Sequence, residues 1–133
     1  MSKKRKDNSW KKIVDRQLQV VYNTKDILGY EIEFYRDLSV VSKNHFVVCV
    51  AEKLCAKMDE LVSDLCKMAR FLQTGKTNEV LELDFELCEK VTNIIKYCAH
   101  SRVLFDNYFL IETLEDTYEK LEKAYTRLDT EIN

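Results

Sequence analysis

Histidine and cysteine are the side chains of this sequence best suited to catalysis or metal binding, and their spacing matches no known site. The two histidines are His45 and His100, and no Glu-x-x-His pattern accompanies them, which removes a helical di-iron site. The cysteines lack the CxxC spacing common in zinc sites. They are Cys49, Cys55, Cys66, Cys88 and Cys98. We therefore expect no metal, no cofactor, no small-molecule substrate and no enzyme activity, and free thiols typical of a reducing intracellular compartment, cytoplasmic or nuclear.

Two further fragments resemble catalytic motifs and depart from them. Arg36-Asp37, followed by His45, resembles the Arg-polar…His signature of the helical HEPN ribonucleases, but the eight residues between Arg36 and His45 exceed that family's spacing. Gly75-Lys76-Thr77 is similar to the end of a phosphate-binding P-loop, but the earlier glycine and the preceding strand are missing. Neither fragment supports an enzymatic interpretation.

The N-terminal segment is the only strongly basic part of the chain. Residues 1–12 carry a net charge of +5, so the other 121 residues carry −7 of the total of −2. The basic residues are Lys3, Lys4, Arg5, Lys6, Lys11 and Lys12. Three interpretations stay open: a nuclear import signal, an arm that contacts nucleic-acid phosphates, or a solubilising terminus.

Apolar residues recur every seven positions through residues 10–42, which predicts a long helix with one apolar face. The repeat consists of Ile13/Val14, Val20/Val21, Ile27/Leu28, Phe34/Tyr35 and Val41, with Trp10, Leu18, Ile32 and Leu38 between them. The poor helix formers at residues 23–26 and Gly29 leave open whether this is one helix or two. The unbroken repeat favours one.

Three more helices are expected after the polar residues 42–45. The second spans Val47 to the turn at Thr74-Gly75, and its stripe contains Val47, Ala51, Leu54, Met58, Leu61, Leu65, Met68 and Leu72. The third begins near Asn78, with Leu81, Leu87/Cys88, Val91, Ile94/Ile95 and Cys98. The fourth has Leu104, Ile111, Leu114, Tyr118, Leu121, Tyr125 and Leu128. A boundary near residues 99–101 carries no glycine or proline, so helices three and four could form one bent helix.

These elements predict an all-α fold, an antiparallel up-down four-helix bundle with long coiled-coil-like helices. A flexible basic tail at residues 1–8 precedes a single helical domain at 9–133. No apolar run approaches the ~20 residues of a membrane span, so we expect no membrane partner.

The aromatic residues outside the main stripes are candidates for a contact surface, because aromatic side chains are enriched at interface hot spots. They are Tyr22, Tyr30, Tyr97 and Phe109. The sequence therefore favours a protein-interaction module that self-associates or binds a partner helix. The alternative is a nucleic-acid-associated protein that uses its basic arm.

Overall fold

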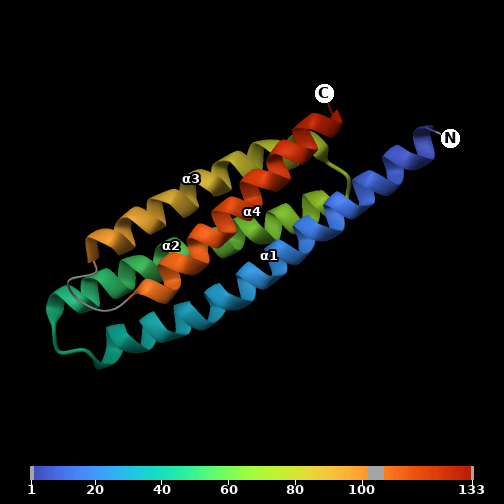
Figure 1. Cartoon of the computed structure of the whole chain (residues 1–133). Coiled ribbons are helices and arrows are strands. Elements are labelled where there is room, and N and C mark those ends of the chain that lie inside the picture. The colour runs from blue at the N-terminus through green and yellow to red at the C-terminus, as the bar shows by residue number, and fades with distance from the viewer. Residues whose placement is uncertain (1, 102–106, 133) are drawn as a thin grey trace.

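The structure, a computed structural model, describes residues 2–101 and 107–132, with side chains at 11–101, 107–123 and 126. The described chain forms four α-helices (Figure 1). They are α1 (Ser2–Val41), α2 (His45–Gln73), α3 (Thr77–Ser101) and α4 (Tyr108–Ile132). The expectation of an all-helical chain is confirmed for this part of the sequence.

Helix α1 is a single helix of 40 residues that runs without a break through residues 23–26 and Gly29. The prediction of a tail at residues 1–8 differs from this, because α1 already begins at Ser2. Lysine and arginine are good helix formers, and no glycine or proline interrupts residues 2–12, so the helix can continue to this point. Figure 1 shows these first turns extending beyond the α2–α3 connection.

Local hydrogen bonds define the start and end of α2. Asn44 adopts an extended backbone conformation, and its side-chain oxygen accepts from the N–H groups of Phe46 (2.9 Å) and Val47 (3.4 Å), which are free at a helix N-terminus. At the other end, Gly75 has φ of 70°. This left-handed conformation favours glycine and turns the chain toward α3.

Helices α3 and α4 are separate, and α4 begins later than expected. Asn107 precedes α4, accepts a backbone hydrogen bond from Ile111 and donates from its side chain to the carbonyl of Cys98 at 2.7 Å. That last contact fixes the start of α4 against the end of α3. The expected stripe position Leu104 lies outside the described residues.

Each helix packs against two others: α1 against α2 and α4, and α3 against α2 and α4. Among the described residues, no Cα atoms of α1 and α3 come within 8 Å, so these two helices are diagonal. Figure 1 shows both termini at one end of the molecule and the α1–α2 connection at the other, close to the start of α4.

The stripe predicted for α2 is buried at every position from Val47 to Leu72. Two expectations for α1 were wrong, because Phe34 and Val41 are 56% and 72% exposed. Helix α1 buries the expected Val21, Leu28, Ile32 and Tyr35, together with the polar Gln17 and Thr24. This spacing of four and three residues follows the 3.6-residue turn and moves Phe34 off the interior face.

The interior face of α4 is also shifted from the expected one. The buried positions are Leu110, Leu114, Thr117 and Leu121. Ile111 and Tyr118, which the sequence placed on the main stripe, are partly exposed at its edge. The side chains of Tyr125 and Leu128 lie outside the described set.

Candidate functional site

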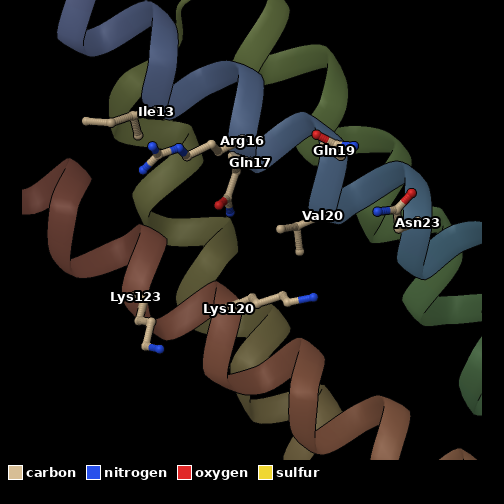
Figure 2. A pocket seen from close by; sticks show the side chains of 8 residues that line it. All are labelled: Ile13, Arg16, Gln17, Gln19, Val20, Asn23, Lys120 and Lys123. Atoms are coloured by element: carbon tan, nitrogen blue, oxygen red, sulfur yellow. The ribbon is translucent and has the colours of Figure 1, made fainter.

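A groove of about 340 Å³ lies between α1 and α4. Its lining residues are Ile13, Arg16, Gln17, Gln19, Val20, Asn23, Lys120 and Lys123. Figure 2 shows that they come from consecutive turns of α1 and from one stretch of α4 facing them. The volume is at the lower end of the range for small-molecule sites, about 300–1,000 Å³.

Gln17, which lines this groove, forms a buried polar pair with a residue behind it. Gln17 is 1% exposed, and its Nε2 donates to Oδ1 of the fully buried Asp84 on α3 at 3.2 Å. Gln17 Oε1 and Asp84 Oδ2 are also buried and have no hydrogen-bond partner. Burial raises the pKa of the Asp84 carboxyl from 3.8 to about 7, and the hydrogen bond from Gln17 opposes this only in part.

The mouth of the groove carries three cationic side chains. Lys120 pairs with Asp116 and Lys123 with Glu119, each at 2.9 Å and one helical turn away. Such exposed pairs contribute only about 0.3–0.5 kcal/mol. Arg16 forms no ion pair within the described part of the chain. All three cations can therefore turn toward an anion at little cost.

A second feature is a group of exposed apolar side chains, here named the apolar end. Its members are Phe34, Val40, Val41, Phe46, Tyr108 and Phe109, exposed by 56–79%. They flank the α1–α2 connection and the start of α4, which Figure 1 places at the same end of the molecule. Exposed apolar side chains gathered at one end of a molecule are a common mark of an interaction site.

A cavity of about 240 Å³ lies at the apolar end between α1 and α4. Phe34 and Tyr35 line it from α1, and Phe109 and Leu110 line it from α4. Asn107, 3% exposed, also lines it, and its Oδ1 is buried without a hydrogen-bond partner. The cavity thus combines apolar walls with one free acceptor, Asn107 Oδ1, which can accept a hydrogen bond from a bound molecule.

Glu31 also lines this cavity; it is half-buried, and burial raises the pKa of its carboxyl above the ordinary value. A carboxyl that ionises less readily than usual is better able to enter an apolar contact, because less charge must be removed from water.

The four aromatic candidates fall in different places. Tyr30 is 76% exposed and lies one turn before Phe34 on α1, while Phe109 belongs to the apolar end. Tyr22 is 43% exposed and its hydroxyl accepts from Gln73 of α2 at 3.1 Å. Tyr97 is partly buried against the core, with Lys57 Nζ 5.3 Å from its ring centre. Only Tyr30 and Phe109 lie near a common surface.

Of the basic candidates, Lys11 and Lys12 are exposed on α1. The side chains of Lys3, Lys4, Arg5 and Lys6 lie outside the described set, although their backbone belongs to α1. The sequence did not single out Arg16, Gln17 or Lys120. The burial of Gln17 could have been predicted from its position, because it lies one helical turn from both Ile13 and Val21 on the apolar side of α1.

The histidines and cysteines form no multidentate site where side chains are described. His45 is the first residue of α2, and its Nε2 lies 3.6 Å from Cys49 Sγ. His100 lies in the last turn of α3. Burial raises the pKa of the Cys88 and Cys98 thiols to about 12. No three His, Cys, Asp or Glu side chains of the described residues are arranged to hold a metal ion.

The comparisons with known proteins do not place the chain in a family. No protein-family model matches the sequence, no curated protein matches it, and no solved structure matches the fold. Within the described ranges, no helix is long and apolar enough to cross a bilayer. The fold and its surfaces therefore define a four-helix all-α protein, and its function has to be argued from these surfaces.

Proposed function

We propose that this chain is a non-enzymatic interaction and assembly module. In this proposal it is an antiparallel up-down bundle with coiled-coil-like helices that associates through its apolar end with a second copy or a partner helix. Short connections at residues 42–44 and 74–76 and the cyclic order of helix contacts support the bundle topology.

The observation that carries the proposal is that two exposed phenylalanines line a cavity that also contains a free polar acceptor. Phe34 and Phe109 are 56% and 62% exposed although they line the same cavity. Fully burying a Phe side chain contributes about 1.5–3 kcal/mol, so covering the exposed part of each of these rings contributes roughly half of that. Asn107 Oδ1 offers an acceptor to a donor on the partner, which adds specificity to that apolar contact.

Light scattering on the full chain over a range of micromolar concentrations tests the proposal. We expect a mass that rises with concentration, and a monomer for the double variant Phe34→Ser/Phe109→Ser. Phe85→Ser is the matched control, because Phe85 is 60% exposed on α3 and lies outside the apolar end. The proposal is contradicted if two results hold together. The wild-type chain stays monomeric, and any partner protein binds the double variant as tightly as it binds wild type.

A second candidate function is nucleic-acid association through the basic start of α1. Lys12 is exposed on α1, one helical turn before Arg16. Basic side chains along one helix face can contact successive phosphates, and the affinity of such binding falls as the salt concentration rises. The test is the salt dependence of DNA and RNA binding before and after deletion of residues 1–8. An unchanged slope rejects the arm.

The cellular compartment belongs to the same proposal. Five free cysteines suit a reducing interior, and the basic N-terminal segment suits nuclear import. Fusing residues 1–12 to a cytoplasmic reporter tests the import signal. A reporter that stays evenly distributed contradicts it.

A further inference from the structure

We infer that the groove between α1 and α4 binds a small organic phosphate, with its phosphate on Arg16, Lys120 and Lys123 and its apolar body against Ile13 and Val20. The inference is independent of the interaction surface proposed above, because none of these residues belongs to the apolar end.

The charges at the mouth indicate an anion. Arg16 lines the groove from α1, and Lys120 and Lys123 line it from α4, so cations from two helices flank one groove. Figure 2 shows Arg16 on α1 and the two lysines on the facing stretch of α4, with their charged ends pointing apart, so all three must turn toward the groove to hold one anion. A guanidinium binds two phosphate oxygens at once, and ammonium groups add point charges. A phosphate that carries close to two negative charges matches this set better than a single carboxylate.

The wall of the groove indicates that the ligand is larger than inorganic phosphate. Ile13 and Val20 are partly buried aliphatic residues, and Val20 faces the open space in Figure 2. An ordinary phosphate ion would leave this apolar surface wet. An aromatic or aliphatic body of a few carbon atoms would cover it and gain the corresponding hydrophobic free energy.

Gln17 indicates a third contact. Its side chain is 99% buried, its Oε1 has no hydrogen-bond partner, and its amide projects from α1 toward the groove in Figure 2. An unpaired buried acceptor is costly, and a ligand hydroxyl or amino group that donates to it removes the cost. Asp84 lies behind Gln17 and is largely neutral below pH 7, because burial raises its pKa to about 7, so it does not repel an anion there.

Calorimetric titration of the full chain at pH 6.5 tests this site. The probes are 4-hydroxyphenyl phosphate, phenyl phosphate and inorganic phosphate. We expect 4-hydroxyphenyl phosphate to bind most tightly and inorganic phosphate least tightly, since each probe has one contact fewer than the one before. Absence of 4-hydroxyphenyl phosphate binding, or equal affinity of all three probes, overturns the inference.

Variants locate the site on the chain. Arg16→Gln/Lys120→Gln should weaken the organic phosphate at least about tenfold, because two charge-assisted hydrogen-bonding groups are lost. Val20→Phe keeps every charge but fills the groove and should abolish binding. The matched control is Lys67→Gln, which removes an exposed cation from α2. Equal weakening by Lys67→Gln overturns the site, provided that circular dichroism shows each variant to be folded.

A nucleic-acid backbone could supply the same phosphate chemistry. A thymidine oligonucleotide is titrated into the same protein for comparison. If it binds in the groove more tightly than 4-hydroxyphenyl phosphate does, the small-molecule assignment is overturned. A much weaker oligonucleotide supports it, because a diester carries one charge per phosphate and cannot place its whole body in a groove of about 340 Å³.

Discussion

Gln17 of α1 and Asp84 of α3 are hydrogen-bonded across the interior, Nε2 to Oδ1 at 3.2 Å, although their helices are diagonal and make no direct backbone contact in the described part. Both residues are at least 99% buried. The remaining two oxygens, Gln17 Oε1 and Asp84 Oδ2, both lack a donor. An ionised Asp84 would hold a buried charge with a single hydrogen bond, so the pair is less costly when the carboxyl is neutral.

The first prediction concerns the pH dependence of stability. The pKa of Asp84 is raised from 3.8 to about 7 by burial, so between these pH values the folded state binds more protons than the unfolded state. The contribution of Asp84 to the free energy of unfolding should therefore fall as pH rises from 4 to 7, by at most about 1.4 kcal/mol per pH unit, and level off above 7. Urea unfolding at pH 5 and pH 8 measures it.

The control for this prediction is Asp84→Asn. An asparagine oxygen accepts from Gln17 Nε2 and carries no charge at any pH. We expect the variant to be more stable than wild type at pH 8 and to lose the part of the pH dependence that Asp84 causes. Equal wild-type and variant stabilities at pH 8 would show that Asp84 is not held in a costly charged form.

A second prediction concerns Lys90, which bridges α3 to α2. Its Nζ contacts Asp64, whose side chain is only 9% exposed, and Glu60 at 3.0 Å. Lys90→Met leaves the Asp64 carboxylate without its cation and should destabilise the fold by about 1–3 kcal/mol, less than for a fully buried pair because Lys90 is 32% exposed. Adding Asp64→Asn should recover part of this loss.

Lys120→Met is the comparison for Lys90. Lys120 and Asp116 are 54% and 60% exposed, so this pair should contribute under about 0.5 kcal/mol. Thermal unfolding of the variants gives the comparison. Similar losses for Lys90→Met and Lys120→Met would argue against the bridging role.

A third prediction follows from the threonine pair between α1 and α4. Thr24 Oγ1 and Thr117 Oγ1 are 3.3 Å apart, and Thr117 donates its only hydroxyl hydrogen to the carbonyl of Thr113 at 2.9 Å. Thr24 must therefore be the donor of the pair. Thr117→Val leaves the Thr24 hydroxyl without its acceptor and should cost about 1–2 kcal/mol, whereas Thr24→Val should cost less.

Urea unfolding of both threonine variants and of the double variant measures this asymmetry. The double variant should be close to wild type, because two valines of similar shape leave no unpaired donor. Equal costs for the two single substitutions would reverse the assignment of the donor.

The two glycines provide a fourth prediction with opposite signs. Gly29 lies within α1, and a Cβ built on it meets no atom within 4 Å, so Gly29→Ala should stabilise the fold by about 0.5–1 kcal/mol. Gly75 has φ of 70°, so Gly75→Ala should destabilise it by about 1 kcal/mol. Melting temperatures of the two variants test this. A rise for Gly75→Ala would contradict the conformational argument.

Local spacing predicted the helical character of the chain, although it left the separation of α3 from α4 open. The apolar repeat predicted α1 as a helix through residues 23–26, and it predicted the buried face of α2 from Val47 to Leu72. The turn at Gly75 also followed from composition, because glycine readily adopts a positive φ. These features depend on residues within a few turns of each other, which is why the sequence alone determined them.

Only the tertiary structure decided which neighbouring positions face inward and which polar groups they meet. Phe34 is exposed while Tyr35 is buried, and the buried polar residues Gln17 and Asp84 meet across 67 positions of sequence. The groove likewise joins Arg16 to Lys120. Burial of a polar side chain depends on the partner that another helix presents to it, and no spacing within one helix contains that information.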